Sequence, residues 1–108
     1  MNEKIKVIIG DESKEFGCML ANSLRGRGFF AVTRDNDGLL LLEAIRSEEP
    51  DVVIVDSIIP GIDAAELIKR CDSFVHKPFF IVTFRIQERF CGAPDNVNGE
   101  RIFYAQAL

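Results

Sequence analysis

Hydrophobic positions along the chain alternate between short, β-branched runs and longer segments with helical spacing. Apolar runs at residues 5–9, 29–33, 52–55 and 79–84 have the length and composition of strands, and a weaker run at 102–105 predicts a fifth. Between them, apolar residues recur three and four positions apart in 13–24, 39–46 and 63–70, which predicts amphipathic helices. Strands that alternate with helices indicate βαβ units and a parallel sheet.

Capping residues and chain breakers mark the ends of these segments. Ser13 and Asp63 are suited to be helix N-caps, and Pro50 closes the second helix. After residue 84 the pattern weakens: residues 86–90 fit a helical turn or two, and residues 92–99 are rich in Gly, Pro, Asn and Asp, as in loops. We therefore predict one domain over residues 1–108 whose C-terminal part is atypical or truncated.

The predicted fold is α/β, a flavodoxin-like, doubly wound, parallel five-stranded sheet with strand order 2-1-3-4-5. Ligands of such sheets bind beyond the carboxyl ends of the strands, near the point where the strand order reverses. Asp11 and Glu12 follow the first strand, Asp56 ends the third, and Thr83 lies near the end of the fourth. Because these three strands are neighbours in the predicted order, we expect the four residues to converge.

The chemistry of this group favours a divalent cation and phosphoryl transfer. Three carboxylates at one sheet edge repel each other unless a cation or protons compensate their charge. A partly hydrated site with oxygen ligands suits Mg²⁺. With Mg²⁺ bound, one carboxylate can attack a phosphoryl group, as in enzymes that form an aspartyl phosphate. The hydroxyl of Thr83 could then donate a hydrogen bond to the transferred group.

Composition limits the partners and the compartment. The net charge of -4 argues against a nucleic-acid surface, and 108 residues leave no room for a DNA-binding module beside this domain. No apolar run approaches the roughly 20 residues of a membrane span, and the N-terminus does not resemble a signal peptide. Three widely spaced cysteines without a CxxC pair suit a reducing compartment. We expect a cytoplasmic protein that binds neither nucleic acid nor membrane directly.

Three segments resemble the receiver domains of two-component response regulators. They are VIIGDES at residues 7–13, DVVIVDSIIPGID at 51–63 and PFFIVT at 78–83. Their order and spacing suit that family, and the likeness covers residues 4–84, whereas residues 85–108 are degenerate. More narrowly, residues 3–7 and 10–16 resemble the stage-zero sporulation regulators within the family.

The resemblance implies a role for each matching residue. Asp56 becomes the phosphoacceptor, and Asp11, Glu12, Asp56 and the backbone carbonyl of Ile58 become the Mg²⁺ ligands, with Glu12 replacing the more common Asp. Thr83 becomes the residue that binds the phosphoryl group and switches. The loop after Asp56 is shaped by Pro60, Gly61 and Asp63. The implied protein is not an enzyme but a signalling domain that a histidine kinase or phosphotransfer protein phosphorylates, in a phosphorelay that can control transcription.

The C-terminal part departs from the family pattern. Receivers carry a Lys-Pro pair after the fifth strand, whereas here Lys77-Pro78 precedes the fourth, and Gln106 or Ala107 stands where the Lys is expected. Bulky Phe84 follows Thr83 where a small residue is usual. Without a fifth helix the last strand would lose its cover, so we expect either a homodimer through the C-terminal face or a local rearrangement after residue 85.

These departures leave other interpretations open. A degenerate pseudo-receiver would bind proteins without phospho-switching, although the intact acidic residues oppose it. A flavodoxin-type enzyme such as a phosphatase would need a general acid that the sequence does not show. Taken singly, Asp56 also fits a strand-end cap, Glu12 a solvated acid in a first helical turn, and Thr83 an ordinary β-branched strand residue.

Overall fold

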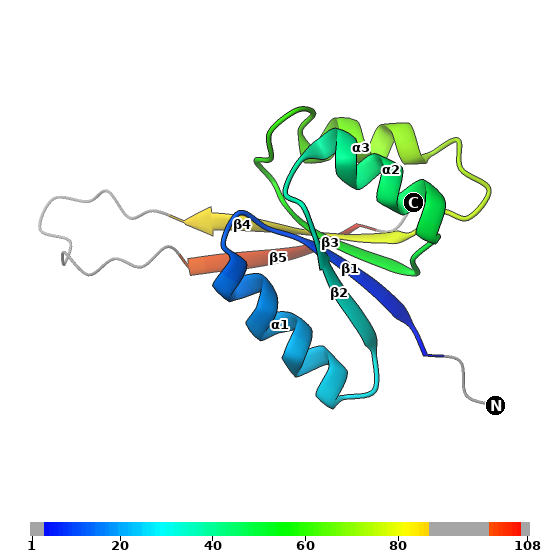
Figure 1. Cartoon of the computed structure of the whole chain (residues 1–108). Helices are drawn as coiled ribbons and strands as arrows, with labels where there is room; N and C mark the ends of the chain where they lie inside the picture. Colours follow the sequence, from blue (N-terminus) through cyan, green and yellow to red (C-terminus); the bar gives the residue numbers. More distant parts are fainter. Residues whose placement is uncertain (1–3, 87–99, 107–108) are drawn as a thin grey trace, which may run out of the picture.

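A computed structural model describes the backbone of residues 4–86 and 100–106 and the side chains of residues 4–84. One sheet carries helices on both faces (Figure 1). The elements in chain order are β1 (Lys6–Gly10), α1 (Lys14–Gly26), β2 (Phe30–Arg34), α2 (Gly38–Glu48), β3 (Val52–Asp56), α3 (Ala64–Cys71), β4 (Phe79–Ile86) and β5 (Glu100–Gln106).

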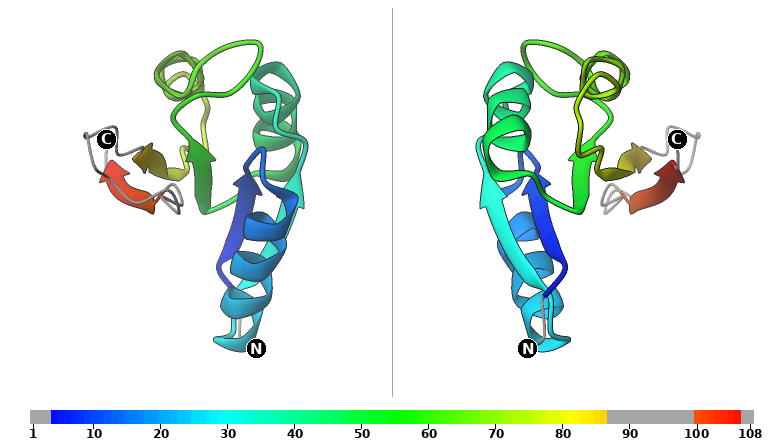
Figure 2. Two further views of the ribbon diagram at one scale, coloured as in Figure 1. Left: turned by 90° about the vertical axis from the view of Figure 1, so that its left-hand side faces the viewer. Right: turned by 90° about the vertical axis from the view of Figure 1, so that its right-hand side faces the viewer.

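The strand order is β2-β1-β3-β4-β5, as predicted, with β2 and β5 at the two edges (Figure 2). The first four strands are parallel, so the α/β class and the doubly wound order are confirmed. The fifth strand corrects the prediction of an all-parallel sheet, because β5 pairs with β4 in the antiparallel direction, with Thr83 opposite Phe103.

The reversal of β5 follows from how strands can be connected. A parallel partner for β4 would require a crossover, usually a helix, to carry the chain back along the sheet. Residues 87–99 contain Gly, Pro and Asn instead of an apolar helical pattern, and the register pairs Ile86 with Glu100. Ile86, predicted to begin a helical turn, instead ends β4. The rest of that turn and the loop predicted at 92–99 lie outside the described residues.

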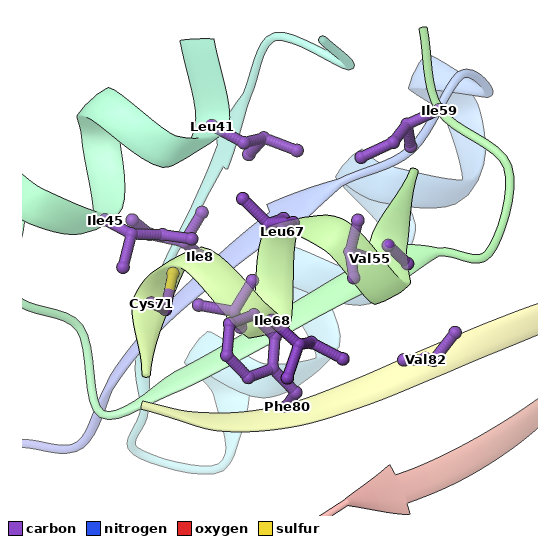
Figure 3. Close-up of a cluster of buried hydrophobic side chains, with 12 residues drawn as sticks. Ile8, Leu41, Ile45, Val55, Ile59, Leu67, Ile68, Cys71, Phe80 and Val82 are labelled. Atoms are coloured by element: carbon purple, nitrogen blue, oxygen red, sulfur yellow. The ribbon is translucent and has the colours of Figure 1, made fainter. Parts of the chain in front are cut away.

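Two apolar cores form, one on each face of the sheet. On one face, α2 and α3 cover side chains from β1, β3 and β4, with Phe80 fully buried among them (Figure 3). On the other face, α1 packs through Ala21, Leu20 and Leu24 against strand residues that include Ile9 and Ile54. Burial on both faces explains why β1 and β3 are continuous apolar runs, not alternating ones.

Side-chain caps define the helix starts that face the carboxyl ends of the strands. Ser13 Oγ accepts a hydrogen bond from the Phe16 amide at 3.2 Å, and Asp63 Oδ1 accepts one from the Glu66 amide at 2.9 Å, as the two predicted N-caps should. The third cap is Asp37, whose side chain accepts hydrogen bonds from the Leu39 and Leu40 amides. All three helices therefore begin at the sheet edge where Asp11, Asp56 and Thr83 lie. Within the described part of the chain, no helix has the length and apolar character needed to cross a membrane.

Candidate functional site

The strand register brings three of the predicted site residues into one row. Asp56 is paired with Thr83 across β3 and β4. Gly10 is paired with Val55 across β1 and β3, so Asp11, one residue further, stands beside Asp56. The row lies at the carboxyl ends of β1 and β3, and on β4 it includes Thr83, three residues before the end of that strand. A doubly wound sheet binds its ligands at this edge.

Asp56 is the buried acid of this row. Only 3% of its surface is exposed, and its Oδ1 accepts a hydrogen bond from the Ile58 amide at 3.3 Å. The loop that follows is tied to β4, because the Ser57 amide donates to the Thr83 carbonyl at 2.9 Å. The Ile58 side chain is 79% exposed, so this residue contributes to the site through its backbone.

Asp11 and Glu12 differ in their surroundings. Asp11 is half-buried, and its Oδ1 accepts a hydrogen bond from the Ser13 amide at 2.8 Å, which holds the carboxylate at the start of α1. Glu12 is exposed. Among the residues that the structure describes, no three or more His, Cys, Asp or Glu side chains are gathered as ligands for a metal ion. Two carboxylates at adjacent strand ends still match the donors that a largely hydrated Mg²⁺ takes from proteins.

Thr83 is the most unusual side chain of the row. The residue is fully buried, and within the described part of the chain its Oγ1 has no hydrogen-bond partner. A buried hydroxyl without a partner costs free energy that an apolar side chain would not. An ordinary β-branched strand residue does not require this hydroxyl, whereas a residue that hydrogen-bonds a group arriving at Asp56 does.

The loop after Asp56 is held against the start of α2. The Gly38 amide donates to the Pro60 carbonyl at 2.7 Å, and Gly61 has a φ of 88°, a left-handed conformation that favours glycine. A Cβ on Gly38 would collide with the backbone of Ile62, whose amide nitrogen would be 2.8 Å away. The residues predicted to shape this loop therefore position it, together with Gly38.

A cavity of about 440 Å³ lies beside Asp11, at a place where the sequence predicted no site. Its polar lining comes from the end of β2 as well as the start of α1, including Lys14, Asp35 and Asn36. The same strand-end reasoning, applied to the polar run after the second strand, would have found it. Arg34, which also lines the cavity, binds the Glu48 carboxylate through two hydrogen bonds of 2.8 Å. This pairing raises the pKa of Arg34 and lowers the pKa of Glu48.

The structure corrects the expected place of Gln106. Gln106 was predicted to stand where receivers carry a Lys near the phosphoacceptor. Because β5 is antiparallel, Gln106 is instead paired with Phe80, three residues before Thr83 and towards the opposite end of the strand. Ala107, the other candidate for that place, lies outside the described residues. Phe84, next to Thr83, is 39% exposed.

Comparison with known proteins gives a consistent group of relatives, although no family model matches the sequence. The signal receiver domain of the response regulator NarL from Mycobacterium tuberculosis superposes with a TM-score of 0.68 at 30% identity, covering 81% of this chain and 71% of that domain. A CheY-like receiver domain from Methylobacillus flagellatus superposes with a TM-score of 0.70 at 17% identity, which supports the fold alone.

Two curated sequences show the same relationship. The transcriptional regulatory protein NarL of Mycobacterium tuberculosis is 35% identical over 74 residues, which are 67% of this chain and 34% of that protein. The sporulation initiation phosphotransferase F of Bacillus subtilis is 32% identical over 71 residues, which are 65% of this chain and 54% of that protein. The chain thus spans about a third of NarL and about half of the phosphotransferase. The narrower likeness to stage-zero sporulation regulators stays a prediction.

Proposed function

Because this chain belongs to the family of response-regulator receiver domains of two-component systems, we propose that it accepts a phosphoryl group on Asp56 in a Mg²⁺-dependent reaction. The donor is a histidine kinase or a phosphotransfer protein. The observation that carries the proposal is the row that Asp11, Asp56 and Thr83 form across three neighbouring strands. In that row a buried acid stands beside a buried hydroxyl that has no hydrogen-bond partner among the described residues.

The reaction follows from these side chains. A carboxylate oxygen of Asp56 attacks the phosphorus of a phosphohistidine, the P–N bond breaks, and its electron pair stays on the imidazole nitrogen. The ring then takes up a proton from solvent. The carboxylates of Asp11, Glu12 and Asp56 and the carbonyl of Ile58 would hold Mg²⁺, which supplies positive charge to the phosphoryl oxygens. The Thr83 hydroxyl donates a hydrogen bond to one of these oxygens and so gains a partner for its buried Oγ1.

The wider role belongs to the same proposal. Receiver domains are signalling domains, and relatives of this chain include transcriptional regulators and a sporulation phosphotransferase. We propose a cytoplasmic phosphorelay component that does not itself bind nucleic acid, and that affects transcription through another segment or partner. The homodimer through the C-terminal face stays a prediction, because the side chains of β5 lie outside the described ones.

Labelling with acetyl phosphate tests the proposal. With Mg²⁺, the full chain should gain one phosphoryl group by intact mass spectrometry, and chelation of Mg²⁺ should prevent it. Asp56→Asn should abolish the product, whereas Asp72→Asn, an exposed carboxylate paired with Lys77 after α3, should leave it unchanged. A product that persists in Asp56→Asn refutes the assignment. No product in the parent would favour the pseudo-receiver.

A further inference from the structure

The loop between β3 and α3 is tied to the start of α2 through one backbone amide. The first amides of a helix have no partner within the helix. In α2 the side chain of Asp37 accepts hydrogen bonds from the Leu39 and Leu40 amides. The Gly38 amide, which precedes them, donates instead to the Pro60 carbonyl at 2.7 Å. The helix start is therefore satisfied only while the loop stays in place.

The same two segments are packed closely around this hydrogen bond. Gly61 has a φ of 88°, and a Cβ at this position would lie 3.4 Å from Asp37 Oδ1 and 3.5 Å from the Gly38 amide nitrogen. A Cβ on Gly38 would lie 2.8 Å from the amide nitrogen of Ile62. Because close packing leaves no room between them, a shift of the loop is transmitted to the first turn of α2.

The other end of the loop is tied to the phosphoacceptor. The Ile58 amide donates to Oδ1 of Asp56 at 3.3 Å, and Pro60 follows two residues later. A carboxylate is a charged acceptor, but its oxygens lose that charge once one of them is bonded to phosphorus. The negative charge then lies on the phosphoryl oxygens, which are the stronger acceptors. The Ile58 amide is therefore drawn away from Oδ1, and the loop is drawn with it.

We propose that phosphorylation of Asp56 loosens the hydrogen bond between the Gly38 amide and the Pro60 carbonyl, so that the first turn of α2 responds to the state of the site. Leu39 and Leu40 follow Gly38 and are 53% and 55% exposed, so the response changes an apolar surface. The inference rests on the proposed function and adds a conformational output to it. Because coupling is reciprocal, breaking the same hydrogen bond should strengthen binding at Asp56 by the same factor.

Hydrogen exchange of the full chain with Mg²⁺ tests the coupling, with beryllofluoride as a mimic of the phosphoryl group. Binding stabilises the folded protein as a whole and so slows exchange. The Gly38 amide should instead exchange roughly three- to tenfold faster, because it loses one hydrogen bond. The control is the Phe74 amide, which donates to the Cys71 carbonyl at 3.0 Å at the opposite end of α3 and should not become faster. Two-dimensional NMR resolves the two amides.

A matched pair of glycine variants tests the reciprocal effect. Gly61 and Gly28 both have a positive φ, 88° and 97°, so alanine at either position adds similar strain. Gly61→Ala should displace the Pro60 carbonyl from the Gly38 amide, and beryllofluoride should then bind roughly three- to tenfold more tightly than to the parent. Gly28→Ala lies between α1 and β2, where a Cβ would meet nothing within 4 Å, and should leave the affinity unchanged.

The outcomes separate this inference from the function on which it rests. If beryllofluoride binds the parent and exchange at Gly38 does not become faster, the coupling is refuted and the phosphoacceptor stands. Equal or weaker binding by Gly61→Ala would also overturn the coupling, because the loop would then only support the site. If the parent neither binds beryllofluoride nor is labelled by acetyl phosphate, the proposed function fails and this inference fails with it. If Gly61→Ala does not fold, exchange of the parent decides.

Discussion

Replacing Thr83 by valine should stabilise the unphosphorylated protein. The two side chains have nearly the same shape, so the substitution changes little except the hydroxyl. In the folded protein Thr83 is fully buried, and Oγ1 has no hydrogen-bond partner within the described part of the chain. In the unfolded chain the same hydroxyl is bound to water. Threonine therefore pays a desolvation cost on folding that valine avoids.

The size of the effect follows from that cost. Burying a hydroxyl without a partner costs about 1–3 kcal/mol in proteins. Valine should raise the free energy of unfolding by about 1 kcal/mol at least, which corresponds to a rise in melting temperature of about 4 °C or more for a domain of this size. The same substitution removes the donor proposed to bind the phosphoryl group. The free energy of unfolding should therefore increase, while binding of beryllofluoride, which mimics a phosphoryl group on an aspartate, should decrease.

Urea denaturation followed by circular dichroism measures the first effect, and beryllofluoride titration with Mg²⁺ measures the second. Thr33→Val is the matched control, because Thr33 is an exposed strand residue; its stability should change by no more than about 0.5 kcal/mol. A parent that is more stable than Thr83→Val would show that the hydroxyl is well satisfied in the folded state. That result would remove the physical reason for giving Thr83 a phosphoryl-binding role.

Three further predictions concern the rest of the fold. Gly38→Ala should lower the free energy of unfolding by about 1–3 kcal/mol in urea, because the new Cβ meets the Ile62 backbone; an unchanged midpoint would contradict the contact. Iodoacetamide at pH 8 should modify exposed Cys18 well before buried Cys71, whose pKa burial raises to about 11, and equal rates by peptide mass spectrometry would argue against that burial. Arg34 lowers the pKa of Glu48 from its ordinary value. The ion pair therefore stabilises the fold above the ordinary pKa of a glutamate, and this stabilisation is lost as the pH falls through the lowered pKa of Glu48. The urea midpoints of the parent and Arg34→Gln should therefore differ at pH 7 and converge in acid, and a constant difference would refute the pairing.

Much of the acidic site could be predicted because its residues follow the strongest strand signals. β1 and β3 are buried on both faces, so they appear in the sequence as uninterrupted apolar runs, and Asp11 and Asp56 stand where those runs stop. Once the strand order is assumed, adjacency of the strand ends follows from geometry. Ser13 and Asp63 were identifiable as caps because a short polar side chain directly precedes each helical pattern.

Other features depend on contacts between distant segments and have no local signature. The residues of β5 suit a strand in either direction, and the direction is set by the connection that precedes it. That Thr83 Oγ1 has no hydrogen-bond partner among the described side chains depends on what surrounds it in the folded chain. The clash that excludes a side chain at Gly38 arises from Ile62, on a loop 24 residues further along the sequence.

The reversed β5 also determines how the molecule can be attached to a surface. Gln106 is paired with Phe80, and the register continues through Val53 to Ile8, the central residue of β1. The first and last strands therefore enter and leave the sheet at the same end, away from Asp56. A bead or sensor chip linked close to the start of β1 or the end of β5 would leave the sheet edge that carries Asp11 and Asp56 open to a large donor protein. With a parallel β5, a linker attached after that strand would instead lie directly beside Asp56.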